Sequence, residues 1–378
     1  MAAIQHDIPM SNTQYSTLQS MFLVAYAVMY MGGGRFIDWV GARAGFAGVM
    51  IWWSLACASH GLARSVRFLA VSRLLLGVGE GGGFPAATKV VSSWFPAEER
   101  ATAMGIINAG TALGAVLAPP AIATVIVNLN WRWVFFFAGA IGIAWTAWWL
   151  IAYRERDDSR QIAPADSAGW FGLLSHLPVW GLVGAKFLSD AAWYFYLFWL
   201  PKYLYDARGF DTRKVGYYGW IPYAASGAGC LVGGWFSSFL LRNGKRSLTF
   251  SRHLALGLSA AVMPSVLLVT RVPVELAIVI FSVAFFGQQS WSTLVMTLPA
   301  DLFPTRTVAS VAGMVGFGGA IGGLVFGQLA GYLLDHGYGY GTVFSLAGSF
   351  HVIAFVVLLI TVPKVEPLFA ERSLKAAL

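Results

Sequence analysis

Long uninterrupted apolar runs constrain this chain more than any other feature of its sequence. A run needs about 20 residues to cross the hydrocarbon core of a bilayer as a helix. Eleven runs approach that length, near residues 15–33, 44–60, 67–91, 101–127, 132–152, 179–201, 215–240, 253–270, 274–298, 307–334 and 342–362. They are continuous rather than alternating, which favours helices over barrel strands. The sequence therefore predicts an all-α membrane protein with eleven transmembrane helices.

The composition agrees with lipid as the surrounding solvent. Of the 378 residues, 57% are hydrophobic and 11% are charged, whereas soluble domains are nearer about 45–50% and about 25%. The net charge of +8 does not indicate a nucleic-acid partner, because the basic residues are scattered and form no patch. Cys57 and Cys230 both lie inside apolar runs, which indicates packing rather than metal binding. We predict no cofactor, no metal site and no nucleic-acid partner.

The distribution of Lys and Arg predicts the orientation. The connecting segments on one side of the runs, which include Lys89, Arg100 and Arg252, carry the larger share of positive charge. By the positive-inside rule this side is cytoplasmic, and it includes the C-terminus. The longest polar connection, residues 153–178, then reads as a cytoplasmic linker between an N-terminal bundle over residues 1–152 and a C-terminal six-helix bundle over residues 179–378.

The two halves are unequal. Five runs precede the linker and six follow it, although many transporters consist of two equivalent halves. An odd number of spans also places the N-terminus outside, in a sequence with no apparent export signal. We therefore expect that the first helix of the N-terminal bundle is missing, through either a misplaced start or a true truncation.

The loop after the first run reads "GRFIDWVGAR" and holds four residues that we assign to gating: Gly34, Asp38, Gly41 and Arg43. The glycines permit a tight turn between two close helices. Asp38 can meet a helix N-terminus or a neighbouring arginine, and Arg43 can pair across the inner face. A weaker copy of the pattern occupies residues 233–246, where Ser238 replaces the acid.

The segment "RLLLGVGEGGGFPAATK", residues 73–89, contains G-x-G-x-x-G. No strand precedes it and no βαβ unit surrounds it, so it is not a dinucleotide-binding loop. Its glycines instead favour close packing of membrane helices. Arg73 and Glu80 are seven residues apart, hence on nearly the same helix face and about 10.5 Å apart along its axis. Arg73 can hold a carboxylate and Glu80 can carry a proton; the alternative is a purely structural ion pair.

Further polar residues lie within the runs. Lys186 and Asp190 are four residues apart and can pair on one helix. Tyr194 belongs to an aromatic series that is either an interface belt or a wall for stacking a sugar ring. The stretches at residues 107–120 and 287–304 offer the polar residues Asn108, Thr111, Gln288, Gln289, Trp291 and Ser292. Amides can both donate to and accept from sugar hydroxyls, or can bond only helix to helix.

Several stretches carry a resemblance to a known family: "RLLLGVGEGGGFP", "NAGTALGA", "KFLSDAAWYFYLFWLPKYL" and "DLFPTRTVASVAG". Together with the loop at residues 34–43, they resemble the major facilitator superfamily, within it the anion:cation symporter family, and most closely hexuronate transporters. The resemblance implies twelve helices in two bundles, alternating access, and proton-coupled uptake of an organic anion across a bacterial inner membrane. It also implies that Arg73 contacts the substrate carboxylate, that Glu80 couples protons, and that Tyr26 lines the site. We expect a monomer.

Our hypothesis is symport of a sugar acid with protons. The predicted substrate-binding residues are Tyr26, Arg73, Asn108, Thr111, Lys186, Tyr194, Gln289 and Trp291, and the predicted proton-coupling residues are Glu80 and Asp190. Two departures from the family bear on the substrate. The Asp-Arg pair of the family's first helix is absent, and Gln288-Gln289 stands where the family has a His-Gln and Asn pattern.

There are three alternative functions. A drug exporter of the same superfamily would carry a Gly-Pro signature in the fifth helix, whereas this chain has "LAPP" there. An intramembrane enzyme would need a nucleophile–base pair or metal ligands, but the six His residues are dispersed, so we predict no enzyme. A non-transporting sensor derived from a transporter remains open because of the missing helix.

Overall fold

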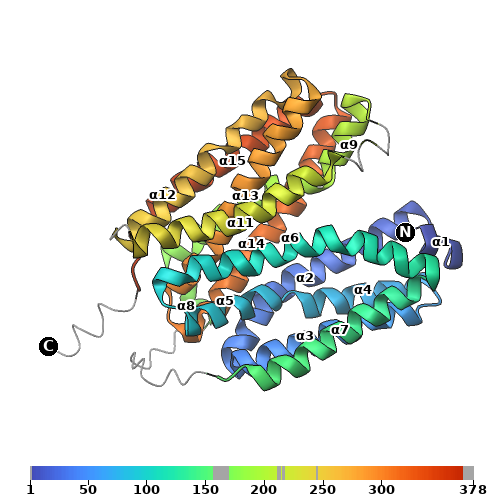
Figure 1. Ribbon diagram of the computed structural model, residues 1–378, viewed down its shortest axis with the longest axis horizontal. Helices are drawn as coiled ribbons and strands as arrows, with labels where there is room; N and C mark the ends of the chain where they lie inside the picture. Colours follow the sequence, from blue (N-terminus) through green and yellow to red (C-terminus); the bar gives the residue numbers. More distant parts are fainter. Residues whose placement is uncertain (1, 156–169, 211–213, 215–217, 244–245, 369–378) are drawn as a thin grey trace. The chain divides into compact units, whose positions relative to one another are not determined.

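The computed structural model describes residues 2–155, 170–210, 214, 218–243 and 246–368 (Figure 1). Within these ranges the chain is helical and contains no strand, which confirms the predicted all-α class. By their internal contacts, the residues separate into two compact units. Unit 1 comprises Met1–Ser93, Leu117–Ile162 and Thr305–Phe317, and unit 2 comprises Trp94–Val116, Ala163–Pro304 and Gly318–Leu378.

The elements of unit 1 are α1 (Ala2–Asp7), α2 (Asn12–Val40), α3 (Ala42–Ser59), the 3-10 helix η1 (His60–Leu62), α4 (Val66–Glu80), α5 (Gly83–Trp94) and α7 (Trp131–Ala152). The last residue of α5, Trp94, is assigned to unit 2. Unit 2 holds α8 (Trp170–Leu173), α9 (Leu177–Arg208), α11 (Trp220–Arg242), α12 (Leu248–Ala261), the 3-10 helix η2 (Met263–Arg271), α13 (Val274–Leu302) and α15 (Gly339–Thr361). Two long helices, α6 (Ala97–Asn128) and α14 (Thr305–Asp335), contribute residues to both units.

Side-chain caps fix where several helices begin. Ser11 and Gln14 form a reciprocal capping box at α2, with N···O distances of 2.9 and 3.1 Å, which satisfies N–H groups that have no partner inside the helix. Asn130 accepts from the N–H of Arg132 at 2.9 Å and begins α7. At the other end of a helix, Gly209 adopts φ 66° and terminates α9, a conformation that favours glycine.

Two predicted runs are broken in the structure. The run at residues 67–91 divides into α4 and α5 at Gly81 and Gly82. A side chain on Gly33 of α2 would lie 2.9 Å from the Cα of Gly82, so the break lets two backbones approach closely. The run at residues 253–270 changes from α12 to the tighter η2 at Met263, next to Pro264, which has no N–H to continue an α-helix.

Eight helical segments in the described ranges are long and apolar enough to cross a membrane, by length and composition. They are α2, α6, α7, α11, α12 with η2, α13, α14 and α15. The remaining predicted spans correspond to α3, to α4 with α5, and to α9. The total of eleven therefore stays a prediction, and so do the domain boundaries at residues 152 and 179.

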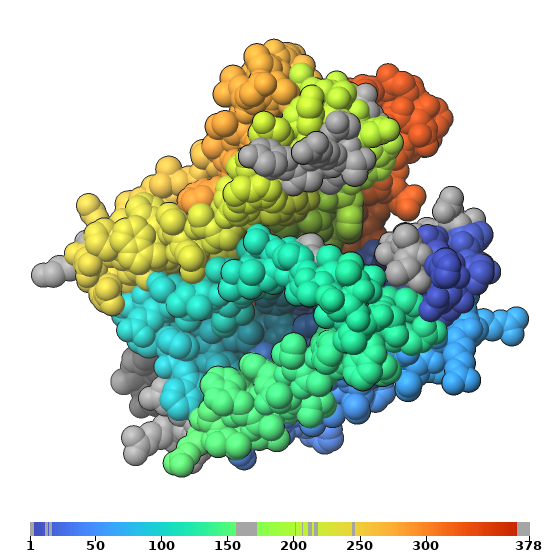
Figure 2. All heavy atoms as spheres, turned by 45° about the vertical axis from the view of Figure 1, so that its right-hand side comes forward, coloured from blue at the N-terminus to red at the C-terminus, as the bar shows by residue number. Residues whose placement is uncertain are grey.

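Each unit has its own packed interior. In unit 1, α3 and α7 run side by side (Figure 1), and Phe46 meets Trp145 and Trp149 edge-on with centroids 5.1 and 5.2 Å apart. The N-terminal residues lie at the surface beside the start of α7 (Figure 2). In unit 2, the rings of Phe195 and Phe281 both pack against Phe344. These clusters hold the helices that carry the polar residues described next.

Candidate functional site

The pair Arg73 and Glu80 lies on α4 of unit 1. Arg73 is half-buried, Glu80 is the last residue of the helix, and the two interact electrostatically. Arg73 also interacts electrostatically with His60 and Cys57 at the end of α3. The segment is helical, so the dinucleotide-loop interpretation is excluded by the structure as well as by the sequence.

Glycines bring α4 against both of its neighbours. A Cβ on Gly77 would lie 2.9 Å from the backbone N of Tyr26 on α2, and a Cβ on Gly79 would lie 2.8 Å from the Cα of Trp53 on α3. Tyr26 stacks on Phe22, with centroids 5.6 Å apart. Because Gly77 stands midway between Arg73 and Glu80, the face that carries both charges is also the face that approaches Tyr26. Unit 1 thus places the backbone of Tyr26 against the α4 segment between Arg73 and Glu80.

The predicted gating residue Asp38 is the centre of a buried network in unit 1. Its carboxylate accepts the backbone N–H of Ser310 at 2.6 Å and that of Ala309 at 3.3 Å, in the first turns of α14. Lys89 Nζ donates to the same carboxylate at 3.0 Å, and the Lys89 and Asp38 side chains are 8% and 1% exposed. A carboxylate in this place stabilises the positive end of the helix dipole. Gly34, one turn earlier, allows the contact, since its Cβ would lie 3.2 Å from the Cα of Ser310.

The other two gating residues hold α3 to α7. Gly41 adopts φ 88°, which L-residues with a side chain rarely adopt. The backbone N–H groups of Ala42 and Arg43 donate to the Glu155 carboxylate at 2.9 and 2.7 Å. The guanidinium of Arg43 donates to the carbonyl of Leu150. The first turn of α3 is therefore capped by an acid more than 100 residues away in the chain.

The weaker copy of the motif has a different chemistry in unit 2. Ser238 lies four residues after Gly234, as Asp38 does after Gly34, and its hydroxyl accepts the N–H of Thr102 in α6, at 3.3 Å. In unit 2 the buried acid that binds cations is instead Asp301 on α13. Its Oδ2 accepts Arg252 Nε at 2.8 Å, and its Oδ1 accepts Arg100 Nη1 at 3.3 Å.

Arg252 is fully buried and has further partners. Its guanidinium donates to Ser237 Oγ and to the Ala97 carbonyl, both at 2.8 Å. Lys89, Arg100 and Arg252 were all predicted to lie in connecting segments, whereas they lie inside α5, α6 and α12. Each pairs with a buried acid, and Lys89 and Arg252 are only 6% and 0% exposed. The sequence pattern did not predict Asp301 or Glu155 as members of these networks, because their partners are remote in the sequence.

Lys186 and Asp190 form an ion pair on α9 of unit 2, with Nζ and Oδ1 2.8 Å apart. Lys186 also donates to Ser292 Oγ of α13 at 2.8 Å. Gly319 of α14 packs directly on the pair, since its Cβ would meet the carboxyl carbon of Asp190 at 3.0 Å. Lys186 therefore already has two partners, the Asp190 carboxylate and the Ser292 hydroxyl, and an incoming carboxylate would have to displace them.

The other predicted residues of unit 2 lie in separate contacts. Asn108 Nδ2 donates to Thr293 Oγ1 at 3.1 Å, and Thr111 Oγ1 donates to the carbonyl of Asn108 at 2.7 Å. Gln289 Oε1 accepts Cys230 Sγ at 3.8 Å. Tyr194 stacks on Phe198, with centroids 6.0 Å apart. Apart from Asn108 with Thr111 and Lys186 with Asp190, no contact described for unit 2 joins one of these predicted residues to another.

Trp291 lies deep in unit 2. It is 0% exposed, its ring meets His351 edge-on at 5.6 Å, and its Nε1 has no hydrogen-bond partner among the described residues. The same holds for both nitrogens of His351 and for the amide of Gln288. Buried polar atoms of this kind are normally satisfied by water. His351 was not among the predicted site residues, because a single His in an apolar run gives no signal.

Comparison with known proteins identifies the family. The Major Facilitator Superfamily profile matches residues 1–327. The chain belongs to the Major Facilitator Superfamily. It is a multi-pass membrane transporter rather than an enzyme.

Its relatives include sugar-acid transporters. The chain is 28% identical to the hexuronate transporter of Escherichia coli K12 over 375 residues, which cover 94% of this chain and 86% of the relative. It is 29% identical to the galacturonate transporter of Dickeya chrysanthemi, covering 69% and 81%. Among solved structures, a transporter FucP in the outward conformation superposes with a TM-score of 0.79 at 14% identity, covering 96% of this chain and 93% of that chain. This likeness shows the fold.

Proposed function

We propose that this transporter takes up a sugar acid, with a hexuronate as the first candidate, together with one or more protons. Alternating access in a bacterial inner membrane, with the C-terminus in the cytoplasm, belongs to the same proposal. Support comes from the hexuronate and galacturonate relatives and from the position of Arg73 and Glu80 on one glycine-flanked face of α4. The α4 face is the observation on which the proposal depends.

The two charges have complementary tasks. Arg73 keeps its proton under all physiological conditions, so it offers the substrate carboxylate a permanent partner. Glu80 can exist with or without a proton, because burial penalises its charged form and Arg73 favours it. When the substrate carboxylate occupies Arg73, the attraction that holds Glu80 ionised is shared, and Glu80 gains a proton more easily. Binding of the anion and binding of a proton therefore favour one another.

Unit 2 supplies a second cation in Lys186, and Asp190 beside it is a second acid for protons. The hydroxyl groups of the substrate would meet amide, hydroxyl and indole groups. The residues proposed for this purpose are Tyr26, Asn108, Thr111, Tyr194, Gln289 and Trp291. Gln289 and Thr111 are partly exposed in unit 2, whereas Trp291 is fully buried, so Trp291 would need to move before it could touch a ligand.

The test separates proton coupling from substrate binding. Purified protein in proteoliposomes is offered glucuronate, galacturonate, galactonate and glucarate in separate uptake assays. Uphill uptake driven by a pH gradient requires net proton movement, whereas counterflow exchanges labelled for unlabelled substrate without it. We expect Glu80→Gln to lose uphill uptake and to keep counterflow. We expect Arg73→Ala to lose both, because the carboxylate then has no partner.

Matched controls lie close by. Arg67 is an exposed arginine on the same helix as Arg73, and Glu99 is an exposed acid at the start of α6; Arg67→Gln and Glu99→Gln should leave both assays unchanged. Loss of counterflow in Glu80→Gln would refute the coupling role of Glu80. Intact counterflow in Arg73→Ala would refute its role in binding. Transport of a lipophilic cation instead of any sugar acid would identify an exporter.

A further inference from the structure

Tyr30 of α2 lies about one turn after Tyr26 and is 7% exposed. Its ring meets the ring of Tyr26 edge-on, with centroids 5.1 Å apart and planes at 85°, an arrangement that aromatic pairs prefer. On the preceding turn, Phe22 stacks on Tyr26. The ring of Tyr26 therefore has an aromatic neighbour in each direction along α2, and Tyr30 is the buried member of the three.

Gly316 of α14 makes room for the ring of Tyr30. A Cβ on Gly316 would lie 2.5 Å from Cζ of Tyr30 and would also overlap Cδ1 and Cε1. Gly313, almost one turn earlier, approaches the backbone carbonyl of Tyr30 in the same way. Both glycines belong to the part of α14 that lies in unit 1. The ring of Tyr30 therefore lies directly on the backbone of α14, where a side chain at position 316 has no space.

The end of α4 also packs on this turn of α2. A Cβ on Gly81, which caps α4, would lie 2.7 Å from the backbone N of Tyr30 and 2.8 Å from the carbonyl O of Tyr26. The backbone around Tyr30 is thus packed against α4 as well as α14, and closely packed backbones have little room to shift. A methyl group added at Gly316 is therefore accommodated by the side chain of Tyr30, which moves to another staggered rotamer.

A change of rotamer at Tyr30 removes the edge-on contact that supports Tyr26. Tyr26 is one of the residues proposed above to meet the hydroxyl groups of the substrate. A hydrogen bond weakens steeply as its angle departs from linearity, so the ring that carries the phenol group has to be held in one orientation. A side chain that is oriented before the substrate arrives also loses less entropy on binding. Loss of the Tyr30 ring should therefore weaken substrate binding.

We propose that Tyr30 is a positioning residue for substrate binding: its ring fixes the orientation of Tyr26, and Gly316 provides the space that the ring of Tyr30 needs. This inference rests on the proposed function, in which Tyr26 lines the sugar-acid site. Tyr30 does not touch the substrate and sets the affinity for it through Tyr26. The glycine on α14 is thereby a determinant of substrate affinity, although it lies on a different helix from the residue that it affects.

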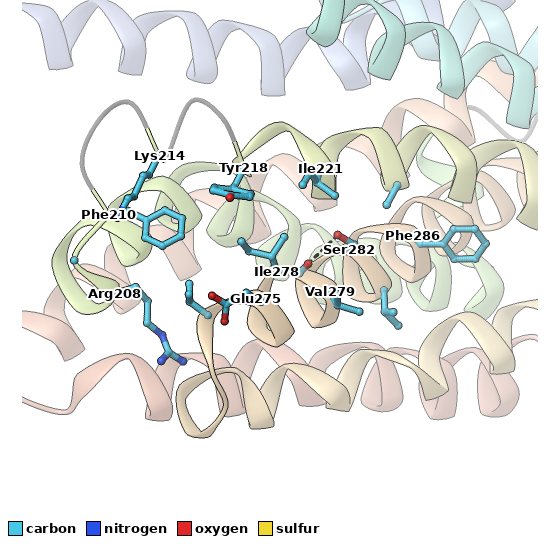
Figure 3. A pocket seen from close by; sticks show the side chains of 14 residues that line it. Arg208, Phe210, Lys214, Tyr218, Ile221, Glu275, Ile278, Val279, Ser282 and Phe286 are labelled. Atoms are coloured by element: carbon cyan, nitrogen blue, oxygen red, sulfur yellow. Dashed lines mark hydrogen bonds between the residues drawn. The ribbon is translucent and has the colours of Figure 1, made fainter.

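A cavity in unit 2 offers an independent control position. It has a volume of about 830 Å³ and lies between α11 and α13, beside the end of α9 (Figure 3). Phe286, which is half-buried, lies at one end of it. None of the described residues that line this cavity is among those proposed to bind the substrate. Phe286→Ala therefore removes an aromatic ring without touching the proposed site.

Counterflow of labelled glucuronate in proteoliposomes measures KM and the maximal rate separately. We expect Tyr30→Ala and Gly316→Ala each to raise KM about twofold to tenfold, the range for one edge-on aromatic pair. The maximal rate per folded protein should stay the same, whereas a folding defect lowers the maximal rate and leaves KM unchanged. In the double variant, KM should equal that of Tyr30→Ala, because the added methyl group then has no ring to displace.

Two control variants separate this effect from general changes in packing. Gly327→Ala adds the same methyl group to the same helix as Gly316→Ala, at a position where it meets nothing within 4 Å. Gly327→Ala and Phe286→Ala should both keep the wild-type KM. A wild-type KM in Tyr30→Ala would overturn the proposal. An increase in the double variant that equals the product of the two separate increases would also overturn it, because the two residues would then act independently.

A second readout does not depend on transport. A fluorotyrosine introduced at position 26 reports the surroundings of that ring by fluorine NMR of the purified full chain in detergent. Tyr30→Ala and Gly316→Ala should shift its resonance, and Gly327→Ala should not. An unchanged resonance in the first two variants refutes the positioning role. A shifted resonance, together with no counterflow of any sugar acid by the wild-type protein, supports the positioning of Tyr26 and refutes only the proposed transport function.

Discussion

Replacing Asp301 by alanine tests the charged network of unit 2 most severely. Arg252 is fully buried, and Asp301 is its only acidic partner among the described residues. Removing the acid leaves a buried guanidinium with two neutral acceptors, Ser237 and Ala97. Uncompensated buried charges of this kind cost about 3–5 kcal/mol. Arg100 loses less, because it is 20% exposed and also donates to the carbonyl of Ala300.

This cost can be converted into a melting temperature. At about 2.1 cal/mol/K per residue, a chain of 378 residues has an unfolding entropy of about 0.8 kcal/mol/K. A loss of about 3–5 kcal/mol then lowers the melting temperature by about 4–6 °C. The assay is thermal unfolding of purified protein in detergent at one fixed scan rate, because membrane proteins commonly unfold irreversibly.

Two further variants make the result specific. Asp335→Ala removes an exposed acid from the end of α14 and should leave the melting temperature within about 1 °C, as surface changes usually do. Arg252→Met combined with Asp301→Ala should recover part of the loss, because the buried charge is then gone. If Asp301→Ala melts like the wild-type protein, or if the double variant is less stable than Asp301→Ala, the network does not stabilise unit 2 in the way described.

Two other predictions concern unit 1. Gly77→Ala should destabilise the protein and reduce its yield, since the new Cβ would lie 2.9 Å from the backbone N of Tyr26, whereas Gly83→Ala meets nothing within 4 Å and should be neutral; equal melting temperatures for the two variants would contradict this packing. The hydrogen bond from Trp131 and the charge-assisted bond from Arg132 lower the pKa of the Asp7 carboxyl from 3.8 to about 2. A lowered pKa stabilises the folded state above pH 3.8, and this contribution is lost as the pH falls towards 2. The rate at which pepsin cleaves the N-terminal segment of the wild-type protein, divided by the rate for Asp7→Asn at the same pH, should therefore rise towards one between pH 4 and pH 2, because pepsin is active over this range and its own pH dependence cancels in the ratio. A ratio of one at every pH would disprove the role of Asp7.

The helices that the sequence predicts best have clear ends and uniform apolar interiors. The run at residues 132–152 matches α7, and the run at residues 342–362 matches α15 within a few residues. The break between α4 and α5 was not predicted, because glycines at helical spacing indicate close packing whether the helix continues or ends. Helix positions are therefore predicted correctly from the sequence where an uninterrupted apolar run defines both ends of the helix.

The buried charge networks were beyond the reach of sequence patterns. Asp38 was singled out, but its partner Ser310 lies 272 residues away, and its cation proved to be Lys89 rather than an arginine. Asp301 and Arg252 are 49 residues apart and were not predicted at all. Such pairs depend on which helices become neighbours, and a single sequence does not encode that in any local period.

The cap that Glu155 provides sets a limit for protein engineering. Because this carboxylate holds the first turn of α3, residues up to 155 belong functionally to unit 1. A protease site, an affinity tag or a split between two co-expressed fragments should be introduced after this residue. A cut placed even one position earlier would detach the acid, leaving the Gly41 turn without its anchor although no helix had been interrupted.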